Sequence, residues 1–169
     1  MDLKPLEKVQ YGVYIITSAH GEKMSGQLAN AVMQVTAEPV EFAVCISKQN
    51  FTYGLIDSSG KFAITALSRE APFEFMGKFG FKSGRNVNKF ENVSYSLSQD
   101  GIPLITQYAT AVYEFEVINK LDVQTHVIFI GKVKNMIMAD ENKDTMTYEY
   151  YHKVKGGLTA KNAPTFIKK

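Results

Sequence analysis

The segment Ser47–Thr52 carries residue types that together can bind a phosphate group. It reads Ser-Lys-Gln-Asn-Phe-Thr and joins an apolar stretch to a predicted helix. Hydroxyl donors, a lysine cation and the free backbone N–H groups at a helix start are the features that hold phosphate. The same residues are also typical of a helix cap beside a solvated lysine. The pattern alone therefore leaves both interpretations open.

The sequence lacks the standard nucleotide-binding fingerprints. The stretch Gly77–Gly80 has neither the spacing nor the following Ser or Thr of a P-loop, and no Gly-x-Gly-x-x-Gly turn is present. A Rossmann dinucleotide domain and a P-loop enzyme are therefore disfavoured.

Composition narrows the class of protein further. The 169 residues carry a net charge of +2 with scattered lysines, so no nucleic-acid partner is expected. No stretch approaches the roughly 20 apolar residues that span a bilayer, and the charged start does not resemble a signal peptide. We therefore expect a cytoplasmic protein with no membrane partner. An apolar content of 45% suits one core, which predicts a single domain over residues 1–169.

Five segments predict β-strands, because they are rich in Val, Ile, Phe and Tyr and are bounded by turn residues. A helix is expected over 51–59, capped by Asn50 and ended by Gly60, and another from Ser68 toward Gly80. A long loop is expected over 81–101, and the polar tail 155–169 would be disordered unless it docks. The pattern favours an antiparallel barrel or sandwich, with strands at residues 11–17, 40–46, 62–67, 110–118 and 126–138.

Charge sets the expected register of the last two strands. Opposite charges then face one another on one side and apolar residues on the other, and a slip of one residue would turn the aromatic face outward. The hairpin end then brings a carboxylate beside an imidazole. The expected pairs are Glu114–Lys134, Phe115–Val133, Glu116–Lys132, Val117–Gly131, Ile118–Ile130 and Asp122–His126.

Seven segments in a fixed order resemble the flavin reductase-like family, whose members have an FMN-binding split barrel. The similarity is greatest to the subgroup of ferric reductases and the flavin domain of high-molecular-weight rubredoxins. The resemblance implies a mainly β, antiparallel, Greek-key-like split barrel with short flanking helices. The segments are 11–17, 25–30, 44–52, 59–63, 79–90, 125–133 and 155–166.

The resemblance also implies a bound FMN near a homodimer interface, with NAD(P)H as electron donor. It places Gln27, Leu28, Ala29 and Asn30 near the ring or ribityl chain, and Ser47, Lys48, Asn50 and Thr52 near the phosphate. Lys89, His126 and Phe166 match other positions around the flavin, and Phe166 could cover the cofactor of either subunit. Thr36–Pro39 departs from the Ser-Asp-Pro-Pro of common flavin reductases, which favours a retained FMN over a diffusible one.

His126 and Cys45 each have two interpretations. His126 is the candidate catalytic residue, oriented by Asp122, and the alternative is a hydrogen-bonded structural histidine. Cys45 cannot form an internal disulfide because it is the single cysteine, and it fits a buried small apolar residue. It also shares a strand face with Ser47, so Cys45 and His126 could form a soft ligand pair for iron.

The sequence and the resemblance together favour an FMN-dependent oxidoreductase that passes electrons from NAD(P)H to an acceptor. Ferric iron, a rubredoxin-like protein and free flavin are the acceptor classes. The first alternative is a non-catalytic FMN-binding electron carrier that a protein partner reduces, and the second is a barrel that has lost its cofactor. NADH and NADPH are not distinguished, because no arginine is an unambiguous 2′-phosphate contact; Arg85 is the one obvious candidate and Arg69 is a poor second.

Overall fold

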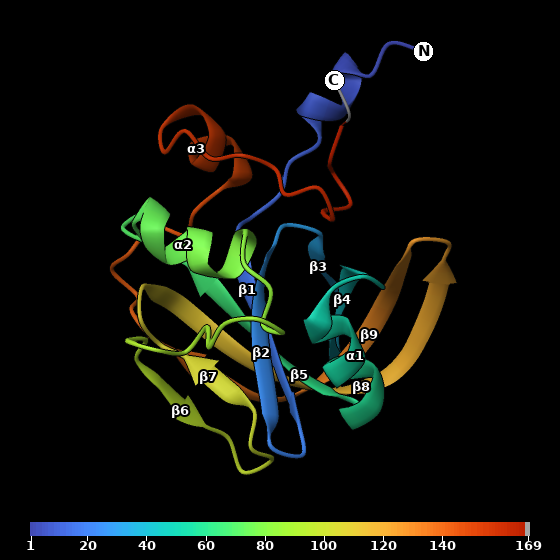
Figure 1. The fold of residues 1–169 in the computed structure, drawn as a ribbon, viewed down its shortest axis with the longest axis vertical. Helices are drawn as coiled ribbons and strands as arrows, with labels where there is room; N and C mark the ends of the chain where they lie inside the picture. Colours follow the sequence, from blue (N-terminus) through green and yellow to red (C-terminus); the bar gives the residue numbers. More distant parts are fainter. Residues whose placement is uncertain (168–169) are drawn as a thin grey trace.

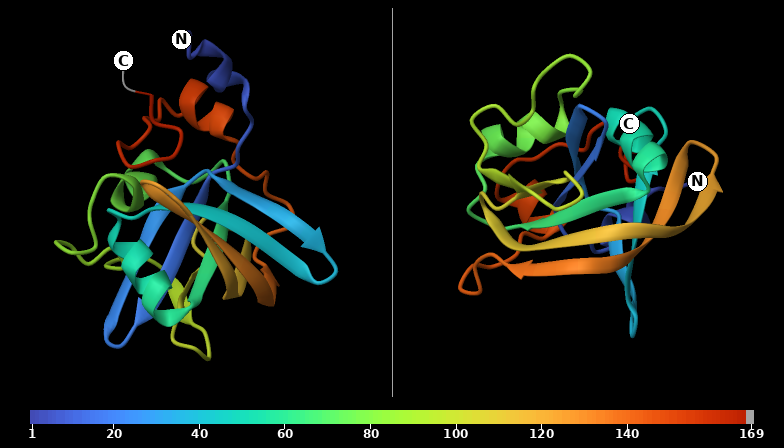
Figure 2. Two further views of the ribbon diagram at one scale, coloured as in Figure 1. Left: turned by 90° about the vertical axis from the view of Figure 1, so that its right-hand side faces the viewer. Right: turned by 90° about the horizontal axis from the view of Figure 1, so that it is seen from below.

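The computed structural model describes residues 1–167 and is organised around one seven-stranded antiparallel sheet. The strand order is β2-β1-β5-β8-β9-β4-β3, and Figures 1 and 2 show that the sheet is strongly curved. This arrangement confirms the expectation of a mainly β fold. The strands are β1 (Tyr14–His20), β2 (Lys23–Ala29), β3 (Val32–Ala37), β4 (Val40–Ser47), β5 (Lys61–Leu67), β8 (Ala109–Val123) and β9 (His126–Met138).

Short elements flank this sheet. A separate two-stranded sheet pairs β6 (Tyr95–Leu97) with β7 (Pro103–Ile105), so the expected loop over 81–101 contains one strand. The helices are η1 (Lys4–Lys8), α1 (Phe51–Ser59), α2 (Phe73–Gly80) and α3 (Tyr148–Lys153). The N-terminal segment and the C-terminal tail, as far as it is described, lie on the same side of the sheet as α3 (Figure 1). Within residues 1–167, no helix is long and apolar enough to cross a membrane.

One of the two expected helices has the predicted bounds, and the other begins later than predicted. Helix α1 has the predicted bounds, and Gly60 ends it in the left-handed conformation with φ of 67°. The second helix was wrongly expected to begin at Ser68, which instead forms an isolated bridge to Thr145. Proline disfavours helical geometry at the residue before it, so α2 begins only after Pro72.

The register of β8 and β9 is partly as expected. Phe115 faces Val133, Glu116 faces Lys132 and Val117 faces Gly131. Irregularities between Glu114 and Phe115 and between Val117 and Asn119 shift the pairing on either side. The remaining expected pairs are therefore wrong: Glu114 faces Asn135, Ile130 faces Asn119 in place of Ile118, and Asp122 faces Val127 in place of His126.

The two irregularities shift the pairing by one residue in opposite directions, so the segments on either side share one register and only residues 115–117 keep the predicted one. Lys134 is left unpaired on β9 at the first, and Ile118 is left unpaired on β8 at the second. Lys134 still reaches Glu116, with 3.5 Å between its Nζ and the carboxylate. Glu116 therefore keeps its predicted partner Lys132 across the ladder and also forms an ion pair with Lys134.

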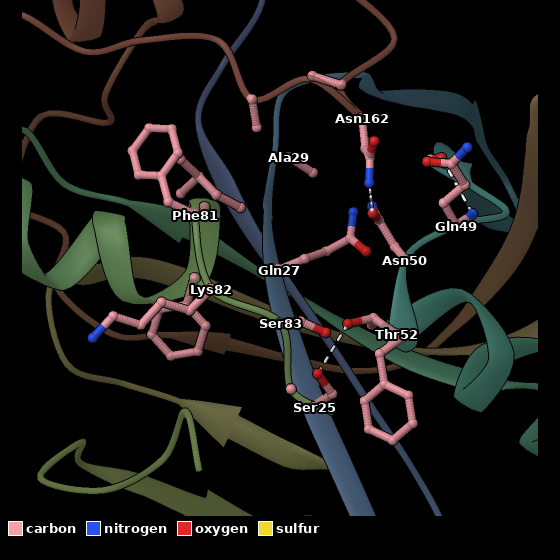
Figure 3. A pocket seen from close by; sticks show the side chains of 18 of the residues that line it. Ser25, Gln27, Ala29, Gln49, Asn50, Thr52, Phe81, Lys82, Ser83 and Asn162 are labelled. Atoms are coloured by element: carbon pink, nitrogen blue, oxygen red, sulfur yellow. Dashed lines mark hydrogen bonds between the residues drawn. The ribbon is translucent and has the colours of Figure 1, made fainter. Parts of the chain in front are cut away.

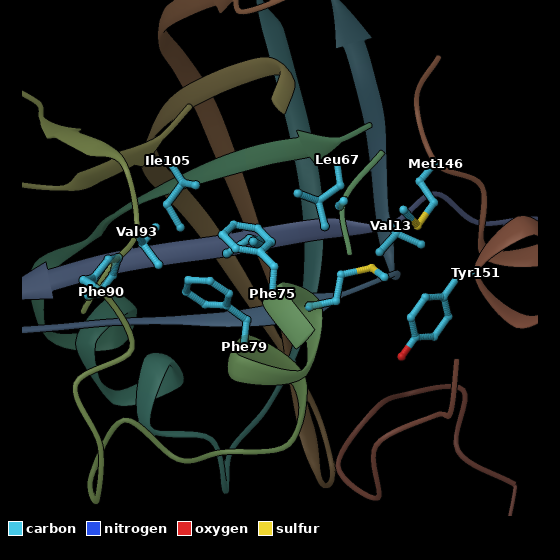
Figure 4. Packing of buried hydrophobic residues seen from close by; sticks show 12 residues of the cluster. Val13, Leu67, Phe75, Phe79, Phe90, Val93, Ile105, Met146 and Tyr151 are labelled. Atoms are coloured by element: carbon cyan, nitrogen blue, oxygen red, sulfur yellow. The ribbon is translucent and has the colours of Figure 1, made fainter. Parts of the chain in front are cut away.

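Two apolar clusters hold the elements that surround the candidate site. Figure 4 shows the first, in which Phe75 and Phe79 of α2 pack with Leu67 and Val13. The second lies within the curve of the sheet, where Phe62 stacks on Phe115 with ring centroids 4.8 Å apart. The first cluster fixes the end of α2 over β2.

Gly131 of β9 allows the rings of the second cluster to approach the backbone. A Cβ atom there would lie 2.6 Å from Cζ of Phe62 and 2.9 Å from Cβ of Phe115. We expect Gly131→Ala to lower the free energy of unfolding by about 1–3 kcal/mol, because overpacking strains a filled core. Urea unfolding measures the change.

The matched control is Gly54→Ala in α1, where a Cβ would meet nothing within 4 Å. This variant should keep or raise stability by up to about 1 kcal/mol, because alanine favours a helix over glycine. Wild-type stability of Gly131→Ala would contradict the packing described for this cluster.

Candidate functional site

A cavity of about 510 Å³ opens where β2, the end of β4, the start of α1, the loop after α2 and the C-terminal tail meet (Figure 3). Its size lies in the range typical of small-molecule sites. The lining comprises Ser25, Gln27, Leu28, Ala29, Asn30, Cys45, Ser47, Gln49, Asn50, Phe51, Thr52, Phe79, Gly80, Phe81, Lys82, Ser83, Gly84, Arg85, Lys89, Ala160, Lys161, Asn162, Ala163 and Pro164.

Two buried polar atoms of the lining lack a hydrogen-bond partner. They are Oε1 of Gln27 and Oδ1 of Asn30, and Figure 3 shows Gln27 between β2 and Asn50. Both oxygens are acceptors, and a buried acceptor left unpaired costs about 1–3 kcal/mol. The cavity therefore suits a ligand that presents N–H or O–H donors at this wall.

The start of α1 forms a second wall. Asn50 occupies the N-cap position, but its side chain accepts no hydrogen bond from the helix backbone and Oδ1 instead accepts from Nδ2 of Asn162 at 3.1 Å. The first backbone N–H groups of α1 therefore have no side-chain cap. Thr52 Oγ1 donates to Oγ of Ser25 at 3.2 Å, which places both hydroxyls beside these groups. This wall can bind an anion.

Arg85 supplies a cation at this end of the cavity. Its Nη1 donates to the carbonyl oxygen of Gln49 at 3.1 Å, and its guanidinium lies 5.3 Å from the ring centroid of Phe51. The expected phosphate residue Lys48 is absent from the lining, because its Nζ forms an ion pair with Asp122 at 2.5 Å. That contact lowers the pKa of the Asp122 carboxyl. Arg85 therefore lines the cavity at the start of α1 and Lys48 does not, and a phosphate contact of Lys48 stays a prediction.

Lys89 brings a buried amino group to the inner wall. Its Nζ donates to the carbonyl oxygens of Gly26 at 2.8 Å and Phe79 at 3.1 Å. An ammonium has three donors, so one is left for a ligand. Burial lowers the pKa of Lys89 to about 8, so the amine is mainly protonated at pH 7.

The C-terminal tail docks across the cavity mouth. Asn30 Nδ2 donates to Oγ1 of Thr165 at 2.8 Å, and His126 Nε2 lies 3.2 Å from the carbonyl oxygen of Asn162. Because a carbonyl only accepts, Nε2 carries the hydrogen and Nδ1 accepts from Oγ1 of Thr125. The tail is therefore ordered by docking as far as residue 167, and residues 168–169 lie outside the described part.

His126 and Phe166 lie outside the cavity lining. Both ring nitrogens of His126 are engaged, and Phe166 is 39% exposed on the tail. The structure therefore gives His126 a tail-holding contact. The expected roles of both residues beside a flavin stay predictions.

Cys45 lies in the cavity lining with Ser47, as the shared strand face predicted. Burial raises the pKa of its thiol. Across the ladder Cys45 faces Ile128, whereas His126 faces Ser47. In residues 1–167, no group of three or more His, Cys, Asp or Glu side chains is placed to hold a metal ion. An iron site of Cys45 and His126 stays a prediction.

The sequence reasoning missed two parts of the lining. The loop Phe81–Arg85 and the tail segment 160–164 contribute ten of its residues, and only Arg85 among them had been singled out, for another role. Their signal was indirect, since long polar loops in compact domains are often functional. The other expected cofactor residues, namely Gln27, Leu28, Ala29, Asn30, Ser47, Asn50, Thr52 and Lys89, all lie in the lining.

Comparison with known proteins identifies the family. Residues 6–158 match the model of the flavin reductase like domain, and the chain belongs to this family. One relative is a high molecular weight rubredoxin of Moorella thermoacetica, which is 44% identical over 98% of this chain and 72% of its own length. Another is a ferric-chelate reductase (NAD(P)H) of Archaeoglobus fulgidus, which is 38% identical over 99% of this chain and 98% of its own length. The solved structure of an FMN-binding protein from Thermus thermophilus is 25% identical with a TM-score of 0.69, covering 80% of this chain and 75% of its own.

Removal of the His126 side chain tests its contact with the tail. We expect His126→Ala to raise the rate of tryptic cleavage after the exposed Lys161 by about two- to tenfold, because one hydrogen bond contributes about 0.5–1.5 kcal/mol. Mass spectrometry of timed digests measures the rate. His20→Ala, an exposed histidine outside the cavity, is the control. Equal cleavage of all three proteins would contradict the contact.

The pKa of Lys89 predicts a pH effect on stability. Lysine in the unfolded chain has a pKa of about 10.4, so between pH 8 and 10 the unfolded state binds more protons at this residue than the folded state. The stability of wild type relative to Lys89→Met should therefore rise over this interval. Urea unfolding at several pH values measures the difference, with exposed Lys23→Met as control. A constant or falling difference would refute the lowered pKa.

Proposed function

We propose that this chain is an FMN-dependent oxidoreductase that passes electrons from NAD(P)H through bound FMN to an acceptor such as ferric iron, a rubredoxin-like protein or free flavin. The observation that carries the assignment is the pair of buried unpartnered acceptors, Gln27 Oε1 and Asn30 Oδ1, on residues that line a cavity whose other wall is a helix start without a side-chain cap. Family membership and the relative named as a ferric-chelate reductase (NAD(P)H) support the same reaction.

The cavity matches the chemistry of FMN at both ends. A flavin ring carries an N–H donor and a ribityl chain carries hydroxyl donors, which are what Gln27 and Asn30 lack. A phosphate is a multiple acceptor, which the uncapped N–H groups of α1, the Thr52 hydroxyl and Arg85 can satisfy. The residues that would hold FMN are therefore Gln27, Asn30, Thr52, Arg85 and Lys89.

These residues have distinct tasks in the proposed reaction. Bound FMN supplies the chemistry of two-electron uptake from a nicotinamide and delivery to an acceptor. Lys89 would keep a positive charge against a ligand that gains negative charge, because its third donor is free of protein contacts. The hydrogen bond from Asn162 to Asn50 holds the tail beside the cavity.

We further propose a homodimer with the cavity near its interface. Strand alternation places Met33, Ile128 and Leu121 on the sheet face that carries Cys45, which lines the cavity. Met33 is 63% exposed and Leu121 is 60% exposed. A large exposed apolar patch that continues a ligand site is typical of an interface. A cytoplasmic location and a single domain over residues 1–169 stay predictions.

Anaerobic spectroscopy tests the proposed reaction. Protein loaded with FMN should show flavin absorption that bleaches on addition of NADH or NADPH and returns when a ferric chelate is added. Persistent absorption after both nucleotides would favour an electron carrier that a protein partner reduces. A protein that fails to retain added FMN would overturn the assignment.

One substitution tests the unpartnered acceptor directly. Gln27→Met removes Oε1 with little change in volume and should weaken FMN binding by about tenfold, as loss of one hydrogen bond of about 1.4 kcal/mol predicts. Titration of FMN fluorescence measures the dissociation constant. Gln10→Met, in an exposed segment outside the lining, is the control. Equal affinities would remove Gln27 from the binding site.

A further inference from the structure

All of the charged side chains that line the cavity are cations. Its lining contains four cations, Lys82, Arg85, Lys89 and Lys161, and no Asp or Glu. Ion pairs elsewhere in residues 1–167, such as Lys61–Asp100 and Lys120–Asp57, join surface cations to carboxylates, but none of those described involves any of these four. Their charge is therefore uncompensated within the part of the chain that the structure describes.

The four cations come from separate segments and lie at different depths. Lys89 is buried at the inner wall, and Arg85 is held beside Gln49 and Phe51. Lys82 from the loop after α2 and Lys161 from the tail are exposed. In Figure 3 the amino group of Lys82 points away from Gln27. Lys82 and Lys161 therefore lie on the solvent-exposed part of the lining, as does Arg85.

The charge exceeds what bound FMN can neutralise. A phosphate monoester carries about −2 near pH 7, so four cations leave an excess of about two positive charges. A cleft lined by charge of one sign can raise the association rate of an oppositely charged ligand by about 10- to 1,000-fold. The excess is therefore available to a second anionic ligand, either the nucleotide donor or the electron acceptor.

We propose that the opening of the cavity selects electron acceptors of negative charge, with anionic ferric chelates as the substrate class, and that Lys82 and Lys161 are its specificity-determining residues. The inference rests on the proposed function. The balanced reaction is NAD(P)H plus two ferric chelates giving NAD(P)⁺, one proton and two ferrous chelates. Each chelate takes one electron at the opening and need not enter the cavity.

Oxidants of opposite charge test the selection. The protein is loaded with FMN and reduced chemically without nucleotide, and its oxidation by ferric EDTA, an anion, or hexaammineruthenium(III), a cation, is followed by stopped flow at low ionic strength. In Lys82→Glu/Lys161→Glu the second-order rate constant for ferric EDTA should fall about tenfold or more and that for the ruthenium complex should rise. Added salt should reduce both effects, because it screens exposed charges.

The matched control is Lys8→Glu/Lys23→Glu, which changes net charge equally through exposed lysines outside the lining. Its two rate constants should change much less. The proposal would be overturned if Lys82→Glu/Lys161→Glu changed the rate constants for both oxidants by the same factor. It would also be overturned if the two double variants changed these rate constants equally.

A binding measurement gives a readout independent of electron transfer. Gallium(III) EDTA has the charge of the ferric chelate and is not reduced. It should shift the amide NMR signals of residues 82–85 and 161 in FMN-loaded wild type, and less in Lys82→Glu/Lys161→Glu. Absence of shifts in wild type would contradict a chelate site.

The outcomes separate this inference from the function on which it depends. A chain that does not retain FMN, or is not reduced by NADH or NADPH, refutes the proposed function. If the protein retains FMN and is reduced by a nucleotide, but the double substitution changes the rate constants for both oxidants equally, only the charge selection is refuted.

Discussion

The amino group of Lys89 joins the edge strand β2 to the end of α2, and the geometry of the cavity depends on that contact. One hydrogen bond goes to the carbonyl of Gly26 in β2 and another to that of Phe79 in the last turn of α2. The second is favourable because the last carbonyls of a helix lack partners within it. Phe79 also packs against Gly26, where a Cβ would lie 3.1 Å from the ring. The buried amine therefore sets the spacing between two walls.

The polar groups in and around the cavity divide into two sets. Neutral acceptors of Gln27 and Asn30 lie inside and are unpartnered, whereas the exposed cations Lys82 and Lys161 lie at the opening. Buried unpaired acceptors discriminate by hydrogen bonding at short range, and exposed cations act over about one Debye length. Under the proposed function, the groups that would recognise a cofactor are therefore separate from those that would attract a diffusing partner.

The sequence predicted those elements whose signal is local. The end of α1 follows from Gly60, and Asn50 occupies the N-cap position as predicted, although its side chain bonds to Asn162 and not to the helix. The centre of the β8–β9 register follows from the charge and aromatic pattern. Strand β2 was missed because Lys-Met-Ser-Gly-Gln-Leu-Ala is poor in β-branched and aromatic residues, so its conformation depends on pairing with β1. The β8–β9 irregularities leave no local pattern, and their opposite shifts cancel.

Whether the position of a site residue could be predicted also depends on whether its contacts are local or distant in the sequence. The polar pattern at the helix start singled out Ser47 and Thr52, and the family resemblance added Gln27; all three lie in the lining. Lys48 was expected near a phosphate but lies outside the lining, because its partner Asp122 is 74 residues away, at the far end of β8. His126 also lies outside the lining and contacts the tail 36 residues later, and its expected role beside a flavin stays a prediction. Partners this distant come from tertiary structure, which no spacing rule describes.

The central claim is that the cavity between β2, α1 and the tail is the flavin site. Mapping of backbone amide NMR shifts during an FMN titration tests it most directly, since each amide reports on its own surroundings. The account predicts that the largest shifts fall on residues 25–30, 49–52, 83–85 and 160–164. Saturable shifts confined to residues outside that lining would contradict it.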